Sequence, residues 1–152
     1  MKQLVMTFYM VGMILTTTMV FAFQNEPDNF RGIKWGTNIN DLPNMQLCDT
    51  ERSAAKYTRK GDEMKIGDAD LDTVYYNFSK GSFCGVFIQF SSLSNYYIIK
   101  QILFRKYGKG ESLSPAEGYK WHGPSVNIVL GYSKDSEKGR IYYLYKPIFG
   151  LH

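Results

Sequence analysis

The sequence predicts an α+β protein with one antiparallel β-sheet of about six strands and two helices on one face of that sheet. Two segments place apolar residues at helical spacing, and several others alternate apolar and polar residues between glycine-containing turns. Aromatic residues make up 16% of the chain, and they suit the half-buried pleated surface of strands. Each half of the domain is expected to contain a helix followed by about three strands. The domain could therefore be an internal duplication of a helix-plus-three-strand unit.

Residues 1–22 are predicted to be a secretory signal peptide. Lys2 precedes a run without charge from Gln3 to Asn25, and Val20 and Ala22 occupy the −3 and −1 positions of a signal peptidase site. The alternative is an uncleaved membrane anchor, because roughly 20 apolar residues can span a bilayer. The Val-x-Ala ending favours cleavage. We therefore expect an exported protein, periplasmic or secreted, with a single α+β domain over residues 23–152.

The first half of this domain should begin with a short helix. Thr37 or Asn38 is a plausible N-cap, Pro43 limits the length of the helix, and Trp35 should pack back onto it. Its apolar face would consist of Ile39, Leu42 and Met45. Strands are expected afterwards in the segments KYTRK, EMKI, LDTVYYNF and FCGVFIQFS. In LDTVYYNF, alternation places Val74, Tyr76 and Phe78 on one face and Thr73, Tyr75 and Asn77 on the other.

The second half repeats the order. A helix is predicted within residues 93–110, with Ser94 or Asn95 as its cap and an end at Gly108 or Gly110. Its apolar face consists of Tyr96, Ile99, Leu103 and Tyr107. The strands that follow are expected in YKWHG, SVNIVLGYS and RIYYLYKP.

The stretch IGDADLDTVYYNF resembles part of a calcium-binding loop. Asp68, Asp70 and Asp72 match its first three ligand positions, but Thr73 stands where a glycine is needed and Ser79 where a bidentate glutamate is needed. We interpret the stretch as a turn leading into a strand, with Asp70 and Asp72 on one strand face. No metal site and no cofactor are predicted.

Cys48 and Cys84 leave two alternatives open. In an oxidising compartment an even number of cysteines suggests a disulfide, which would stabilise the fold by roughly 3–4 kcal/mol. The other alternative is a pair of free cysteines.

Catalysis has little support in the sequence, which lacks the usual nucleophile, zinc and phosphate-binding motifs. The histidines are His122, beside a predicted turn, and His152, the last residue. A small envelope hydrolase that uses carboxylates and His122 is the alternative function.

The favoured function is non-enzymatic binding of a protein or another cell-envelope component. The aromatic residues exceed what one small core usually absorbs, so some should lie on an outward sheet face, where they suit partner contacts. Tyr75, Tyr142 and Lys146 are the predicted binding residues. Removing residues 1–22 lowers the net charge only from +4 to +3, with both signs interspersed, so no nucleic-acid partner is expected.

The strings FRGIKWGT, YTRKGDEMKIGDADL, YYNFSKG and YYLYKPI together resemble an uncharacterised family of small exported bacterial proteins. This resemblance covers nearly all of the chain after residue 22 and implies export, but no known activity. The order of elements is also similar to helix-plus-sheet modules of secreted inhibitors and outer-membrane-assembly proteins, which bind other proteins. That similarity concerns architecture alone.

Overall fold

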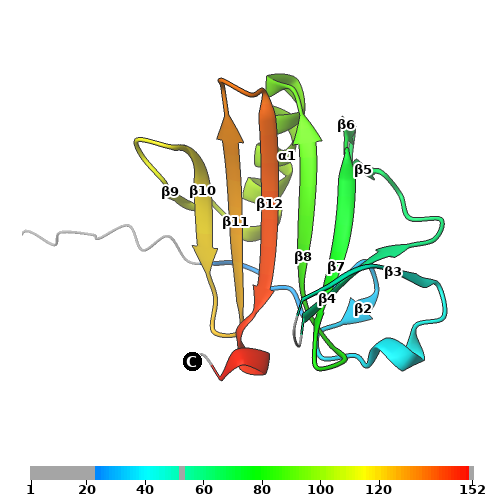
Figure 1. The fold of residues 1–152 in the computed structure, drawn as a ribbon. Helices are drawn as coiled ribbons and strands as arrows, with labels where there is room; N and C mark the ends of the chain where they lie inside the picture. Colours follow the sequence, from blue (N-terminus) through cyan, green and yellow to red (C-terminus); the bar gives the residue numbers. More distant parts are fainter. Residues whose placement is uncertain (1–22, 52–53, 151–152) are drawn as a thin grey trace, which may run out of the picture.

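The computed structural model describes residues 23–51 and 54–150 (Figure 1). The predicted signal peptide and His152 lie outside these described residues. In the described part of the chain, no helix is long and apolar enough to cross a membrane.

One large antiparallel sheet organises the protein, and within the described residues it has eight strands rather than about six. Their spatial order is β3-β4-β7-β8-β12-β11-β10-β9. In chain order the strands are β3 (Met45–Glu51), β4 (Ala54–Arg59), β7 (Thr73–Ser79), β8 (Ser82–Ser91), β9 (Glu111–Ser112), β10 (Glu117–His122), β11 (Val126–Ser133) and β12 (Lys138–Tyr145). Two meanders, β3-β4-β7-β8 and β9-β10-β11-β12, therefore meet at the central pair β8 and β12. The last strand of each half lies in the middle of the sheet.

The predicted second-half helix is confirmed as α1 (Leu93–Tyr107). Its buried side chains are Tyr96, Ile99, Leu103 and Tyr107, the predicted apolar face. Gly108 is its C-cap, also as predicted, but the N-cap is Ser92, whose hydroxyl accepts a hydrogen bond from the Asn95 backbone N–H. The predicted caps Ser94 and Asn95 are wrong, because the helix begins almost directly after β8 ends at Ser91.

The predicted first-half helix is wrong. Asn38 is an N-cap as expected, but it begins only the 3₁₀ turn η1 (Ile39–Asp41). The Leu42 N–H bonds the Ile39 carbonyl, and the next residue, Pro43, has no N–H to continue a helix. Trp35 accordingly has no helix to anchor and instead stacks on Phe83 of β8, with ring centroids 4.9 Å apart.

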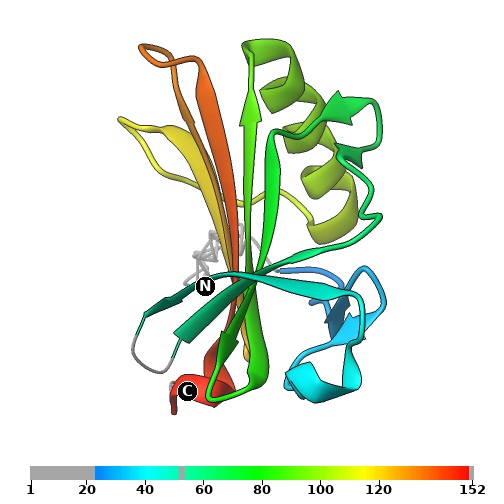
Figure 2. The same ribbon diagram turned by 45° about the vertical axis from the view of Figure 1, so that its right-hand side comes forward.

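One face of the large sheet is covered. Figure 2 shows α1 and the small hairpin of β5 (Lys65–Ile66) and β6 (Ala69–Asp70) on the same side of the strands. The hairpin of β1 (Asn29–Phe30) and β2 (Ile33–Lys34) also covers this face, because the Phe30 ring lies 5.8 Å from Tyr76 and 5.3 Å from Tyr143. The core lies between these elements and the strands, and its side chains include Val74, Tyr76, Phe78, Ile88, Phe90 and Ile141.

The other face of the sheet, here called the open face, carries no α-helix from the described residues, but the sheet curls at one edge, so that the β3–β4 hairpin projects on this side (Figure 2). The 3₁₀ turn η2 (Lys146–Phe149) after β12 borders the lower end of this face. Along β7 the residues alternate between buried and half-buried, which confirms the predicted division of LDTVYYNF into two faces. This sheet face is available for contacts with a partner.

Candidate binding face

Three aromatic side chains form a row across the centre of the open face. Phe87 lies directly opposite Tyr75 on one neighbouring strand and opposite Tyr142 on the other. The rings of Tyr75 and Phe87 are nearly parallel with centroids 6.3 Å apart, and those of Phe87 and Tyr142 are 4.7 Å apart. Directly opposed residues share a face of the sheet, so these rings make one continuous surface. We call Tyr75, Phe87 and Tyr142 the aromatic row.

Lysines lie at both ends of this row. The Lys56 ammonium on β4 is 5.2 Å from the centroid of the Tyr75 ring, within reach of a cation–π interaction. At the other end, Val129 pairs with Tyr142 and Lys120 pairs with Val129. Lys120 is held by Glu111 at 3.2 Å. The row thus has an apolar centre and one lysine near each end.

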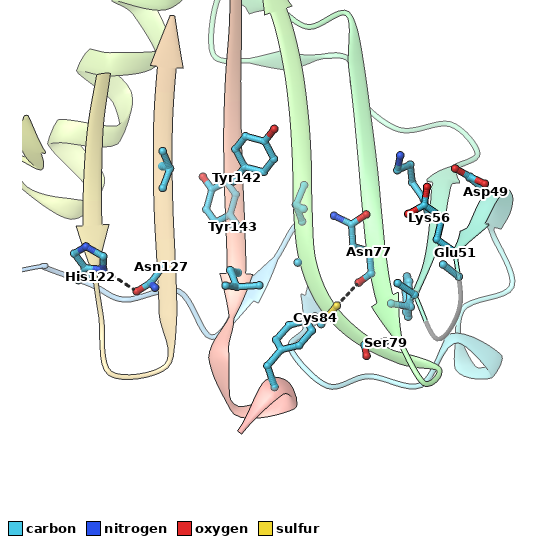
Figure 3. A pocket seen from close by; sticks show the side chains of 18 residues that line it. Asp49, Glu51, Lys56, Asn77, Ser79, Cys84, His122, Asn127, Tyr142 and Tyr143 are labelled. Carbon is cyan, nitrogen blue, oxygen red and sulfur yellow. Dashed lines mark hydrogen bonds between the residues drawn. The ribbon is translucent and has the colours of Figure 1, made fainter. Parts of the chain in front are cut away.

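A groove of about 490 Å³ lies beside the aromatic row (Figure 3). We call it the sheet-face groove. Its volume falls in the range of ligand-binding pockets, roughly 300–1,000 Å³. Its apolar lining includes the side chains of Ala54, Val129, Leu144 and Phe149. Its polar lining includes Asp49, Glu51, Lys56, Asn77, His122 and Asn127.

Gly85 lines the groove near the middle of the sheet. It lies between Asn77 on β7 and Leu144 on β12, in a row of opposed residues next to the aromatic row. A Cβ at this position would stand 2.5 Å from the backbone oxygen of Tyr143, so only glycine fits without a shift of the strands. The absence of a side chain lets the β8 and β12 backbones approach closely at this point of the groove.

A second hollow of about 300 Å³ lies on the other side of Tyr142. It shares Val129 and Tyr142 with the sheet-face groove and is also lined by Gly131 and Arg140. Tyr142 is therefore a wall between two hollows, and 45% of its surface is exposed. Arg140 has no ion pair with any residue that the structure describes.

The two ends of the sheet-face groove differ in chemistry. Figure 3 shows Asp49 and Glu51 at one end and His122 with Asn127 at the other. Asp49 and Glu51 are exposed, and neither forms an ion pair within the described part of the chain. At the opposite end, His122 Nδ1 lies 3.3 Å from Asn127 Oδ1.

The three predicted binding residues lie in two different places. Tyr75 and Tyr142 both lie in the aromatic row. Lys146 does not lie on the sheet, because it begins η2, where its backbone N–H donates to the Ser125 carbonyl over 2.8 Å. Sequence reasoning missed Phe87, which joins the two tyrosines. No signal in the sequence identifies it, because the pairing of FCGVFIQFS with the strand of Tyr75 contains a β-bulge.

Cys48 and Cys84 are both free thiols. Cys48 is exposed on the edge strand β3, whereas Cys84 is buried on β8, with its sulfur 3.3 Å from the Asn77 carbonyl. Three strand spacings of about 4.8 Å separate these strands, more than the roughly 7 Å between Cα atoms that a disulfide spans. The structure therefore does not contain the disulfide that the sequence left open. We expect two reactive thiols in the unfolded, non-reduced chain, and a count of zero would contradict this.

The groups of the alternative, hydrolytic function are divided between two hollows. His122 shares a smaller hollow of about 230 Å³ with Glu111, whose carboxylate pairs with Lys120 at 3.2 Å. His122 on β10 and Asp49 and Glu51 on β3 line opposite ends of the groove, with five strands between them (Figure 3). A shared catalytic centre needs its groups within hydrogen-bond reach of one substrate atom or one water. Burial raises the pKa of the Cys84 thiol to about 11, so a nucleophilic thiolate is not formed near neutral pH.

The aspartates of IGDADLDTVYYNF contact different partners. Asp70 lies in β6 and pairs with Lys65 at 3.0 Å. Asp72 lies just before β7 and accepts hydrogen bonds from Ser91 and Lys138. The prediction that Asp70 and Asp72 share one strand face is therefore wrong, since they fall in different segments. Across residues 23–51 and 54–150, no three carboxylate, thiol or imidazole groups come together to hold a metal ion.

Comparison with known proteins finds no match: no family model, no curated protein and no solved structure is similar to this chain. The expected membership of a family of small exported proteins therefore stays a prediction.

Proposed function

We propose that this protein is an exported, non-enzymatic binding protein that holds a protein or another component of the cell envelope against its open face. The aromatic row and the sheet-face groove are the contact region. The single observation that carries this proposal is the continuous surface of Tyr75, Phe87 and Tyr142 beside an apolar groove of about 490 Å³.

Physical reasons support a contact role for these rings. Tyrosine and phenylalanine offer a large, rigid contact area at a small cost in side-chain entropy. The rings of the aromatic row are held by one another and by neighbouring strands, so little further ordering is needed on binding. Tyr142, at the centre between two hollows, is the expected hot spot.

The hydrolytic alternative is not carried forward, since Asp49 and Glu51 lie at the opposite end of the groove from His122, and Glu111, the carboxylate that shares a hollow with His122, is paired with Lys120. The predicted export and the absence of a nucleic-acid partner remain part of the proposal. The two meanders, each preceded by a helical turn or helix and each ending at the sheet centre, also support the proposal that the domain arose by internal duplication.

Photo-crosslinking tests the binding role. A benzoylphenylalanine at position 142, in the full chain expressed in the cells that produce it, should give light-dependent adducts. Tyr97 is the matched control, because it is a tyrosine with the same 45% exposure but lies on α1. Tyr142→Ala should abolish binding of the component that the crosslinking identifies, and Tyr97→Ala should not. Equal adduct formation at both positions, or none at 142, would refute the proposed face.

A further inference from the structure

We propose that the occupant of the sheet-face groove is an extended polypeptide segment that crosses the strands, with an apolar side chain over Gly85 and a lysine or arginine at the β3 end. This inference rests on the proposed function and specifies its partner.

The length of the groove suits an extended chain. One row of opposed residues runs along it from Asp49 on β3, through Asn77, Gly85 and Leu144, to His122 on β10. Six strand spacings of about 4.8 Å give a length of at most about 29 Å, which an extended chain at about 3.3 Å per residue crosses in eight or nine residues. The groove can therefore accommodate a short linear segment of another protein, of at most eight or nine residues.

Side chains must hold such a segment. The central strands pair with neighbours on both sides, so their backbone N–H and C=O groups are already hydrogen-bonded. The Asn77 carboxamide faces this groove and makes no hydrogen bond to any group that the structure describes (Figure 3). A carboxamide offers an acceptor oxygen and an NH₂ donor, the complement of the N–H and C=O of a peptide unit. Asn127, three strands away, keeps its NH₂ group available beside the contact with His122.

The centre of the groove fits an apolar side chain. Gly85, Leu144 and Tyr142 line this part of the groove and leave an open space between them. Phe149 of η2 also lines the groove, with 47% of its surface exposed. Filling this space would remove apolar surface from water on both partners, which is the main favourable contribution to association.

The β3 end fits a cationic side chain. Asp49 and Glu51 both face the groove and have no ion pair within residues 23–51 and 54–150, and the nearest lysine across the strands, Lys56, turns to the Tyr75 ring instead. Three strand spacings of about 4.8 Å separate this end from Gly85, the length of about four extended residues. The bound segment should therefore carry its basic residue about four positions from its apolar anchor.

A random ten-residue peptide display library is the probe. Panning it on the protein recovered from the producing cells should enrich peptides with a basic residue about four positions from a large apolar one. Asn77→Ala and the double variant Asp49→Asn with Glu51→Gln should each bind these peptides about five- to tenfold more weakly. The double variant should also lose most of the salt dependence of binding.

Matched controls separate this result from a loss of folding. Asn40→Ala, and Glu63→Gln with Asp68→Asn, make the same chemical changes at exposed positions away from the groove, and should bind within twofold of the parent. Peptides that bind the groove variants as well as the parent would overturn the inference. A Tyr142-dependent adduct in cells that is lipid or glycan, with no peptide enriched, would overturn it too but leave the binding function standing. No adduct at position 142 would remove the binding function itself.

Discussion

The two faces of the large sheet both carry tyrosines, but one face buries them and the other leaves them accessible. The neighbouring tyrosines Tyr75 and Tyr76 project to opposite faces, as do Tyr142 and Tyr143 on β12. Tyr76 and Tyr143 are buried under the covering elements, whereas Tyr142 is 45% exposed and Tyr75 is half-buried. Since the side chains are identical, the difference comes from the cover: α1 and the small hairpins bury one face and leave the other to a partner.

The largest expected effect is a difference in stability between two phenylalanines of β8. Phe90 is fully buried on the covered face, and Phe87 lies half-buried in the aromatic row. We expect Phe90→Ala to lower the free energy of unfolding by about 3–5 kcal/mol, since it leaves a cavity. Phe87→Ala should cost about 1 kcal/mol, because it loses only ring contacts at a surface. Urea unfolding followed by circular dichroism measures both, and similar losses would mean that the open face is also core.

A pair of glycines sharpens the same contrast. A Cβ on Gly139 would overlap the Phe90 ring, whereas a Cβ on Gly131 meets no described atom within 4 Å. Gly139→Ala should therefore destabilise the protein by about 1–3 kcal/mol through overpacking. Gly131→Ala should change stability by less than about 0.5 kcal/mol. Thermal unfolding would show a fall of several degrees in Tm for the first variant alone, and a large fall for Gly131→Ala would place that residue against hidden structure.

Much of the covered face could be predicted from the sequence. The spacing of Tyr96, Ile99, Leu103 and Tyr107 identifies the buried side of α1, because in a long helix the same face recurs turn after turn. The alternation of LDTVYYNF likewise separates the two faces of β7. Strand β3 was missed for a physical reason: nearly all of its side chains are exposed, so MQLCDTE has no alternation to detect.

The candidate site was harder to predict, because its parts meet only through strand pairing. A β-bulge makes Cys84 an extra residue opposite β7, with Asn77 paired to Gly85 and Phe78 to Phe83. Without the bulge, Phe83 and Phe87 would lie on the same face; with it, Phe83 is core and Phe87 joins the aromatic row. Tyr75 and Tyr142 could be selected from composition and alternation, but the residue between them depends on a register that the sequence does not specify.

A smaller effect is expected from the hydroxyl groups of two neighbouring tyrosines. On the covered face, the Tyr76 hydroxyl donates to Asp62 over 2.8 Å, and Asp62 also pairs with Arg31 at 2.9 Å. Burial raises the pKa of Tyr76 to about 12, so the phenol is a neutral donor at all ordinary pH values.

Tyr76→Phe keeps the ring and removes this hydrogen bond, so it should cost about 1–2 kcal/mol. The Tyr75 hydroxyl on the open face makes no hydrogen bond to the described residues, and Tyr75→Phe should cost a few tenths of a kcal/mol at most. Chemical denaturation of the two variants distinguishes them. A loss at Tyr75 equal to that at Tyr76 would show that the open-face hydroxyl has a structural role.

The smallest expected effect is a pH dependence from Asp72, near the upper end of the sheet. The hydrogen bond from Ser91 is the main cause that lowers the pKa of this carboxyl from its ordinary value; partial burial opposes it, and Lys138, 3.1 Å away, assists. A carboxyl whose pKa is lower in the folded state stabilises the fold above its unfolded pKa, near 4, and loses that contribution as the pH falls through the folded pKa.

Asp72→Asn should therefore lower the free energy of unfolding by a few tenths of a kcal/mol at pH 7, as expected for a pair with a 41% exposed carboxylate, and the difference from the parent should vanish at low pH. Denaturant unfolding at several pH values between pH 7 and pH 2 measures it, with Asp68→Asn as the control for removing one negative charge. A difference that grows as the pH falls would have the wrong sign. It would mean that the Asp72 carboxylate destabilises the folded state. The contacts of Asp72 with Ser91 and Lys138 would then not help to hold β7, β8 and β12 together.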